Sequence, residues 1–355
     1  MNKPILAYTL GDPTGIGPEV VVGAWIRPEI HELCRPVAVG HVEILRRAAK
    51  LLGANVEVRA IDDPTEASSL AASSSPRVIS CLHSGSDEVL LAPAASIDAR
   101  GGQAAYDALV AAARLALEGR IDGLVTAPLH KTALWLAGHH YPGHTELLAE
   151  LCGVRDVAMM LYLAPDETIR SPHGLGVVHV TLHMALADVW KHMSGDAIVT
   201  KIRLADEVMR AMQVARPRIG VCALNPHGGE SGLFGDEETR IIAPAIERAR
   251  CDGFDAQGPF PTDTLMVRAR DGEFDAVVAM YHDQGHIALK LLGMHRAVNV
   301  TLGLPIVRTS VAHGTAHDLA WQGRAEVGSM IEAVRVAARL AETRRAEHVR
   351  RSGVS

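Results

Sequence analysis

Histidines follow three strand-like apolar runs of this chain, and these residues are the best suited to chemistry. His183 comes after residues 176–182, His227 after residues 218–224 and His282 after residues 276–280. Open α/β sheets bind their ligands at the carboxyl ends of strands, and neutral imidazoles are the commonest ligands of zinc and similar ions. The pattern predicts a three-histidine metal site. The chain has 18 histidines, so spacing alone leaves open that these three are ordinary core or surface residues.

Lys290, Asn299 and Arg308 form a second group, of cations and hydrogen-bond donors, downstream of His282. Arginine grips a phosphate through two parallel hydrogen bonds, and lysine binds it as a point charge. The group therefore suits a phosphate monoester. The alternative is that all three are exposed polar residues, which is the usual state of Lys and Arg.

Two glycine-rich stretches bear on cofactor binding. Gly15 and Gly17 follow the strand-like residues 5–10, but Val20 stands where a dinucleotide fingerprint needs its third glycine, so we reject a Rossmann motif. Residues 313–316, His-Gly-Thr-Ala, form a glycine turn with a hydroxyl donor ahead of a helix. Backbone N–H groups in such a turn can meet a phosphate.

Strand and helix patterns alternate along almost the whole chain, which predicts an α/β fold with mostly parallel sheets. Hydrophobic residues make up 48% and aromatic residues only 4%, so the core must consist of Ala, Val, Leu and Ile, as in helices layered on a parallel sheet. Asp236 is expected to cap a helix over 236–250. Residues 62–100 predict surface loops with one or two embedded strands. Expected strands are 5–10, 36–40, 56–61, 121–126, 157–163, 175–182, 218–224, 276–280 and 298–302, and expected helices include 41–52, 103–118, 194–214 and 326–347.

Composition limits the partners and the location. The net charge of −6 and the lack of a Lys/Arg-dense stripe argue against a nucleic-acid partner. No apolar stretch approaches the roughly 18 residues that span a bilayer, and the N-terminus has no signal-peptide pattern. Five cysteines without a C-x-x-C pair predict free thiols in a reducing compartment. We expect a cytoplasmic protein without a membrane partner.

Six ordered blocks resemble the signature blocks of the 4-hydroxythreonine-4-phosphate dehydrogenase (PdxA) family. The resemblance runs from residue 5 to about residue 340, through residues 11–19, 143–146, 224–227, 281–285, 301–305 and 308–316. The family is similar in fold to isocitrate and isopropylmalate dehydrogenases. The resemblance therefore implies a homodimer of two-lobed α/β subunits that bind NAD without a Rossmann fingerprint. The first lobe would comprise 1–126 and 304–355, and the second, 127–303, would carry the metal ligands and the dimer interface.

Carried over by motif, the resemblance assigns a role to each candidate residue. His183, His227 and His282 match ligands of one divalent ion (Zn, Mg, Mn or Co), which the family holds across the dimer interface. For the proton transfers the nominees are Asp263, His144 and Lys131. The matched substrate contacts are His144, Thr145, Lys290, Asn299 and Arg308, and the region analogous to the cofactor side contains Gly303, His313, Gly314 and Thr315.

The reaction that the resemblance implies is oxidation of a secondary alcohol at C3 by NAD, followed by decarboxylation of the 3-oxo acid. Residues 137–143, 232–238 and 286–290 are similar to the branch that acts on 4-phospho-D-threonate or 4-phospho-D-erythronate, giving dihydroxyacetone phosphate and carbon dioxide. The alternatives are 4-phosphooxy-L-threonine, from pyridoxal phosphate synthesis, and an aromatic cis-dihydrodiol, which residues 308–310 disfavour because they keep the phosphate pattern. Two other classes also stay open: a metallohydrolase that uses the same histidines, and a non-catalytic phosphate-binding module.

Overall fold

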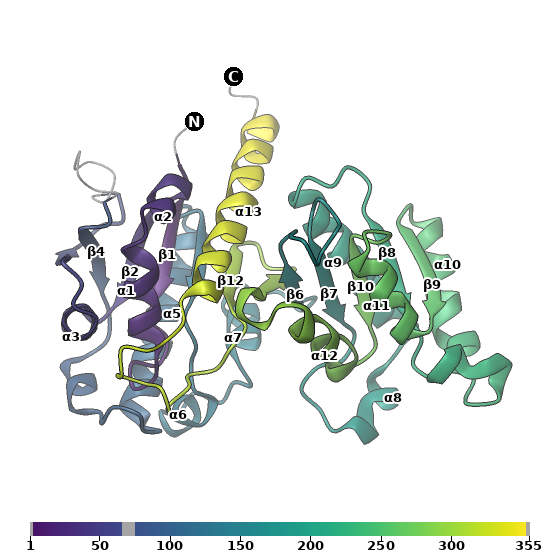
Figure 1. The fold of residues 1–355 in the computed structure, drawn as a ribbon, viewed down its shortest axis with the longest axis horizontal. Coiled ribbons are helices and arrows are strands. Elements are labelled where there is room, and N and C mark those ends of the chain that lie inside the picture. The colour runs from purple at the N-terminus through teal and green to yellow at the C-terminus, as the bar shows by residue number, and fades with distance from the viewer. Residues whose placement is uncertain (1–2, 66–74, 353–355) are drawn as a thin grey trace. The chain divides into compact units, whose positions relative to one another are not determined.

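The structure is a computed structural model that describes residues 3–65 and 75–352, and its chain divides into two compact units (Figure 1). Unit 1 combines Met1–Arg155 with Leu304–Ser355, and unit 2 is Asp156–Gly303. The boundary expected after residue 126 differs from this division by the segment 127–155. That segment stays with unit 1 because its helices α6 (Lys131–Leu136) and α7 (His144–Leu151) pack against α5 (Ala99–Leu117).

Unit 1 contains a parallel sheet with the strand order β3-β4-β2-β1-β5-β12. Its central strands are short and apolar, and every residue of β1, β5 and β12 is buried. The strands are β1 (Ile5–Thr9), β2 (Arg35–Gly40), β3 (Glu57–Ile61), β4 (Val78–His83), β5 (Gly123–Thr126) and β12 (Val307–Val311). The helices besides α5 to α7 are α1 (Gly17–Trp25), α2 (Pro28–Leu33), α3 (Val42–Leu51), η1 (Asp87–Leu91) and α13 (Gly328–Ser352).

The core of unit 1 lies between the sheet and its helices. Leu109 and Ala112 on the apolar face of α5 pack with Val37 of β2, Leu124 of β5 and Leu147 of α7. Small residues at these positions let the helices approach the sheet closely, as the low aromatic content predicted.

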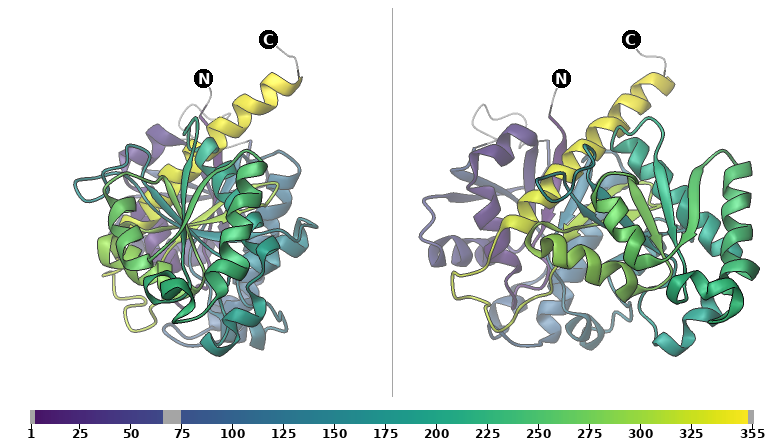
Figure 2. Two further views of the ribbon diagram at one scale, coloured as in Figure 1. Left: turned by 90° about the vertical axis from the view of Figure 1, so that its right-hand side faces the viewer. Right: turned by 45° about the vertical axis from the view of Figure 1, so that its right-hand side comes forward.

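Unit 2 contains a mixed sheet with the order β11-β6-β7-β10-β8-β9. Helices lie on both faces of this sheet (Figure 2). Strand β6 is antiparallel to both β7 and β11, and the remaining pairs are parallel. The strands are β6 (Ala158–Leu163), β7 (Leu175–His179), β8 (Arg218–Cys222), β9 (Asp255–Phe260), β10 (Ala276–Ala279) and β11 (Val298–Leu302). The helices are η2 (Leu186–Asp188), α8 (Val189–His192), α9 (Gly195–Ala211), η3 (Pro226–Gly232), η4 (Glu238–Ile242), α10 (Ala243–Cys251), α11 (Thr262–Arg270), α12 (His282–Gly293) and η5 (Met294–Arg296). The predicted fold class, mostly parallel sheets with flanking helices, is confirmed.

Three local expectations need correction or completion. The helix expected over 236–250 begins with the wider turn η4, and Asp236 does not cap it because its carboxylate instead accepts a hydrogen bond from Arg240. Strand β4 is one of the strands expected inside 62–100, of which residues 66–74 lie outside the described part of the chain. Across the described residues, every helix is too short or too polar to cross a membrane.

Candidate active site

The three predicted metal ligands all belong to unit 2 and follow neighbouring strands of its sheet. His183 comes shortly after β7, His227 shortly after β8, and His282 is the first residue of α12, directly after β10. Strands β7, β10 and β8 are consecutive and parallel. Because the carboxyl ends of parallel strands share one edge of a sheet, the three histidines leave the sheet on the same side.

His282 and His183 are the two predicted ligands that the structure brings together, with ring centroids 6.1 Å apart. His282 also stacks on His286, one turn later on α12, at 3.8 Å between ring centroids. His286 Nδ1 in turn lies 3.1 Å from Nε2 of His179, the last residue of β7. Burial, followed by the neighbouring imidazoles, lowers the pKa of His179 to about 3 and that of His286 to about 4. Both buried rings are therefore neutral at neutral pH, and they are the rings next to which His282 packs.

His227 lies in η3, where residues His227 to Ser231 all have positive φ. Its exposed ring has Nδ1 3.1 Å from a carboxylate oxygen of Glu230. The segment is anchored by the buried Glu238, whose Oε1 accepts the backbone N–H groups of Leu224 and Asn225. Within residues 3–65 and 75–352 of a single chain, no three His, Cys, Asp or Glu side chains are grouped to hold a metal ion.

Lys290, Asn299 and Asp263 occupy three different elements of unit 2. Lys290 lies two turns after His282 on α12, and its charge is one of the causes that lower the pKa of His286. Asn299 lies in β11, opposite Leu161 of β6. Asp263 is in the first turn of α11, is exposed, and accepts the N–H of Thr264 at 2.8 Å.

Arg308 lies in the middle of β12 in unit 1, with only 3% of its surface exposed. Its Nη2 donates to Oγ1 of Thr126, the last residue of the adjacent strand β5, at 2.7 Å. Burial lowers the pKa of Arg308 to about 9, and the charge of Glu146 offsets part of that effect. Arginine binds phosphate and carboxylate groups through parallel hydrogen bonds, so this position suits an anionic substrate group.

Three predicted residues of unit 1 open two helices, and the charge of Arg308 acts on one of them, His144. His144 and Thr145 open α7, and Lys131 opens α6. Burial, followed by the charges of Arg308 and Lys131, lowers the pKa of His144 well below its ordinary value. The first turn of α7 adds backbone N–H groups and the positive end of a helix dipole. Hydrogen-bond donors and positive charge therefore converge here, as phosphate binding requires.

The predicted cofactor residues His313, Gly314 and Thr315 lie in the loop between β12 and α13. Gly314 is exposed, and a Cβ atom there would meet nothing within 4 Å, so its backbone is open to a ligand. Thr315 is buried, and its carbonyl accepts the N–H of Ile16 at 3.0 Å. Gly303 belongs to unit 2, and a Cβ atom there would come within 2.0 Å of the Asp156 carbonyl oxygen. Close backbone packing is therefore sufficient reason for that glycine.

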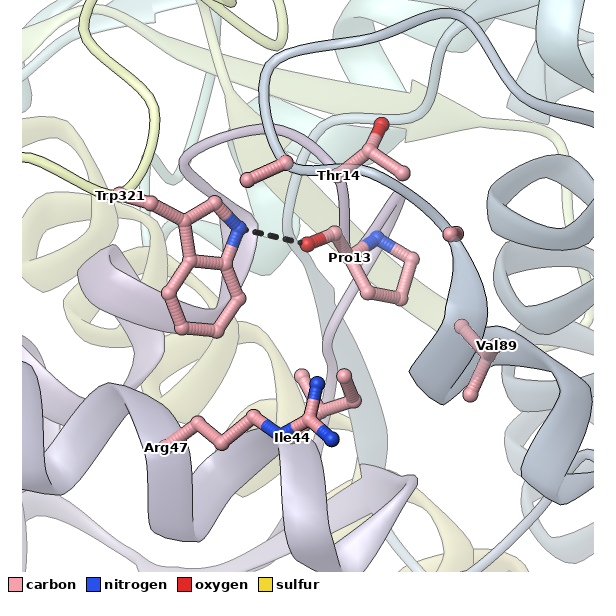
Figure 3. A pocket seen from close by; sticks show the side chains of 8 residues that line it. Pro13, Thr14, Ile44, Arg47, Val89 and Trp321 are labelled. Carbon is pink, nitrogen blue, oxygen red and sulfur yellow. Dashed lines mark hydrogen bonds between the residues drawn. The ribbon is translucent and has the colours of Figure 1, made fainter.

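A cavity of about 190 Å³ opens beside the same loop of unit 1 (Figure 3). Trp321 supplies one wall, and its Nε1 donates to the carbonyl oxygen of Pro13 at 2.9 Å. Arg47, on α3, contributes a cation to a lining that is otherwise mostly apolar. The lining residues are Pro13, Thr14, Ile44, Arg47, Val89, Ala92, Ala94 and Trp321.

The sequence interpretation missed several residues that shape these sites. The stacked pair His282 and His286 could have been found from their spacing of four residues, which places both on one face of a helix. His179 and Thr126 carry no local signal, because they end apolar strands and meet their partners only through the fold.

Comparisons with known proteins agree with the sequence blocks. The family model described as "Pyridoxal phosphate biosynthetic protein PdxA" matches residues 32–337. The D-threonate 4-phosphate dehydrogenase of Salmonella typhimurium is 45% identical over 346 residues, which cover 96% of this chain and 100% of that protein. The 4-hydroxythreonine-4-phosphate dehydrogenase of Beijerinckia indica is 48% identical over 336 residues, or 94% of each chain.

A solved structure leads to the same result. The crystal structure of 4-hydroxythreonine-4-phosphate dehydrogenase from Klebsiella pneumoniae has a TM-score of 0.83 to this chain at 42% identity. The match covers 96% of this chain and 98% of that one. With this identity over nearly the full length, and with a family model that spans most of the chain, the protein belongs to the PdxA family.

Proposed function

We propose that the protein is an NAD-dependent dehydrogenase that oxidises C3 of a 4-phosphorylated four-carbon hydroxy acid and then decarboxylates the product. The favoured substrate is 4-phospho-D-threonate or 4-phospho-D-erythronate, and the products are dihydroxyacetone phosphate and carbon dioxide. The observation that carries the proposal is the buried Arg308, whose charge burial disfavours and which a phosphate would neutralise. The dehydrogenase names of the relatives support the reaction type.

The second candidate is oxidation of 4-phosphooxy-L-threonine. It is favoured by the relative from Beijerinckia indica, which is named a 4-hydroxythreonine-4-phosphate dehydrogenase and is 48% identical, against 45% for the D-threonate enzyme. Both substrates carry a terminal phosphate, so the Arg308 position serves either one.

The proposed reaction has two balanced steps. The C3 hydroxyl proton goes to a base and the C3 hydride goes to NAD, which when bound supplies the hydride acceptor. The C1–C2 bond then breaks, its electron pair forms the enolate of the C3 carbonyl, carbon dioxide leaves, and C2 takes up a proton. For these transfers we retain Asp263, His144 and Lys131 as nominees. The lowered pKa of His144 keeps its imidazole unprotonated at neutral pH but also makes it a weak base, so it does not favour His144 over Asp263 and Lys131.

Substrate contacts are proposed for both units. In unit 1, Arg308, His144 and Thr145 offer a cation, an imidazole and a helix N-terminal turn to the phosphate. In unit 2, Lys290 and Asn299 are assigned as further contacts. Binding energy gained at the phosphate, remote from the reacting carbon, positions C3 for hydride transfer.

A divalent ion (Zn, Mg, Mn or Co) is proposed for His183, His227 and His282. The donor set fits such an ion, because three imidazoles leave one edge of the unit 2 sheet and His183 and His282 already face each other. When bound, the ion supplies positive charge for the oxygen that loses its proton and for the enolate. We propose that a second copy of the chain completes the site.

The proposed homodimer is supported by an exposed apolar stripe on α12. Ile287 and Leu291 are 58% and 83% exposed and lie four residues apart on the helix that begins with His282, and Met294, 51% exposed, follows at the start of η5. Leu186 and Trp190 are exposed nearby in sequence to His183. Contiguous exposed apolar surface of this kind is typical of a protein interface.

For the cofactor we propose NAD at the loop after β12, with His313, Gly314 and Thr315 in contact with it. The open backbone at Gly314 fits a phosphate or ribose group. Gly303 is retained as the fourth cofactor residue by resemblance. We also propose a cytoplasmic location, supported by five thiols that are all free.

The test is to follow absorbance at 340 nm with NAD, a divalent ion and each of the three phosphorylated acids, while inorganic phosphate release is measured in parallel. A dehydrogenase reduces NAD and releases no phosphate. Phosphate release without NADH would favour the metallohydrolase, and binding without either product would favour the non-catalytic module.

A further inference from the structure

A buried carboxylate fastens the loop between β12 and α13. Glu19, in the first turn of α1, is 1% exposed. Its Oε2 accepts the backbone N–H of Trp321 at 2.6 Å, and its Oε1 accepts that of Gly323 at 2.7 Å. Hydrogen bonds from N–H groups to a carboxylate are stronger than neutral ones, and the helix N-terminus favours the negative charge of Glu19.

The two residues that Glu19 holds have unusual backbone conformations. Trp321 has φ of +59° and Gly323 has φ of +71°. A left-handed conformation is costly for a large side chain such as Trp, so its surroundings must enforce it. Glu19 does so through the Trp321 N–H, and Pro13 does so through the indole Nε1.

The same N-terminal segment grips the loop at its other end. The N–H of Ile16 donates to the Thr315 carbonyl at 3.0 Å. Gly15 packs so closely that a Cβ atom there would come within 2.8 Å of Thr315. The loop is thus fixed at Thr315, which belongs to the proposed cofactor contacts, and at Trp321, which closes the cavity of Figure 3.

We propose that Glu19 is a positioning residue for cofactor binding: it holds residues 315–323 in the conformation that binds the dinucleotide, without touching the dinucleotide itself. The inference rests on the proposed function, because it takes the loop after β12 as the NAD site. If the binding conformation is populated only in part, the apparent Kd for NAD rises by the inverse of that fraction. Loss of a hydrogen bond from the loop to Glu19 should therefore weaken NAD binding and leave binding of the phosphorylated acid unchanged.

The test compares full-length wild type with Glu19→Gln, Gly323→Ala and a control, Asp122→Asn. In Glu19→Gln the side chain keeps its size, but one backbone N–H now faces an NH₂ group. Gly323→Ala strains a positive φ without a clash, since the nearest atoms to its Cβ lie 3.9 Å away. Asp122 also accepts a backbone N–H in unit 1, from Ile5 at 2.7 Å, so its variant reports what a generic loss of such a bond does.

Each protein is examined by three methods. Calorimetry gives the Kd for NAD, steady-state kinetics gives kcat and the KM values for NAD and for the phosphorylated acid, and amide hydrogen exchange without ligand reports on residues 315–323. For Glu19→Gln we expect a Kd and KM for NAD raised about tenfold, as for one lost charge-assisted bond, with faster loop exchange. The KM for the phosphorylated acid and kcat at saturating NAD should stay within about twofold. Gly323→Ala should shift the NAD constants in the same direction, and Asp122→Asn should not.

Several results overturn the inference. They are an unchanged Kd for NAD in Glu19→Gln, an equal rise in Asp122→Asn, or a fall in kcat at unchanged KM for NAD. If Glu19→Gln does not fold, an unchanged Kd in Gly323→Ala overturns it alone. A wild type that binds no NAD contradicts the proposed function itself, and that outcome is distinct from a wild type that binds NAD and a variant that binds it equally well.

Discussion

Replacing Arg308 by methionine should make the protein more stable and a poorer binder of its substrate. Methionine nearly matches the length of the arginine stem but carries no charge. Burial lowers the pKa of Arg308 to about 9, and at about 1.4 kcal/mol per pKa unit a shift of this size disfavours the charge by roughly 5 kcal/mol. Loss of the bond to Thr126 costs about 1.5–3 kcal/mol in the other direction. The net expectation is a gain of about 2–3.5 kcal/mol in the free energy of unfolding, in line with other buried charges replaced by apolar groups.

The sign of the pH dependence follows from the direction of the shift. Because the folded-state pKa of Arg308 is lowered, the destabilisation is complete at neutral pH and fades only as pH rises through about 9. Wild type should therefore gain stability relative to Arg308→Met above pH 9. Urea unfolding at pH 7 and at pH 10 measures both differences.

Substrate binding by Arg308→Met should be weaker than that of wild type, although its stability is higher. Loss of a charge-assisted contact of about 1.5–3 kcal/mol raises the KM for the phosphorylated acid by about 10- to 150-fold. Inorganic phosphate at ten times its Kd should stabilise wild type by about 1.4 kcal/mol and should leave Arg308→Met unaffected.

A matched control variant, Arg218→Met, should change the stability in the opposite direction. Arg218 pairs with the buried Asp275 at 3.0 Å, so Arg218→Met leaves a buried carboxylate uncompensated and should destabilise the protein. If Arg308→Met is less stable than wild type, or if its KM is unchanged, the interpretation of Arg308 as a phosphate contact held at a cost in stability fails.

Three further predictions address the metal, pH and assembly. His227→Ala should abolish bound metal and turnover with the fold intact, while the exposed His192→Ala keeps both; full metal content in the first variant, by elemental analysis, would count against the ligand assignment. His144 has a lowered pKa, so wild type loses stability as pH falls below about 6.5; His144→Gln should lose less, and equal losses in urea titrations would contradict the neutral imidazole. Leu291→Asp should convert a dimer to monomers by light scattering, whereas Leu233→Asp, equally exposed but outside α12, should not; a dimeric Leu291→Asp would exclude the α12 stripe as the interface.

The sequence predicted most of the strands and missed β9 and β12. Strands β1, β5 and β10 appear where expected, because apolar runs that alternate with helices mark buried parallel strands. Strand β6 was also expected from its apolar run, but it is antiparallel to both of its neighbours. Strand β12 was not expected, since Arg308, Thr309 and Ser310 occupy its centre. Their burial is possible only because partners outside the strand receive them: Thr126 accepts from Arg308, and the Ala333 carbonyl accepts from Thr309.

The candidate site residues could be listed from the sequence, but the residues that contact them and hold them in place could not. The three predicted ligands were proposed from strand ends and family blocks and remain a prediction, whereas the contact of His179 with His286 could be seen only in the fold. The hydrogen bond from the Trp321 N–H to Glu19 joins residues 302 positions apart. No local sequence pattern can reveal a contact between residues so far apart. Similarly, the sequence pattern changes from strand to turn after residue 126. Only the packing of the segment 127–155 on α5 shows that this segment belongs to unit 1.

The central claim, oxidation at C3 followed by decarboxylation, is tested most directly by product stoichiometry. Purified protein is incubated with NAD, a divalent ion and 4-phospho-D-threonate, 4-phospho-D-erythronate or 4-phosphooxy-L-threonine, and NADH, carbon dioxide and dihydroxyacetone phosphate are measured together. We expect equal amounts of all three products from a D-configured acid, with a higher kcat/KM than for the L-threonine derivative. NADH without carbon dioxide, or no NADH from any of the three acids, would contradict the account.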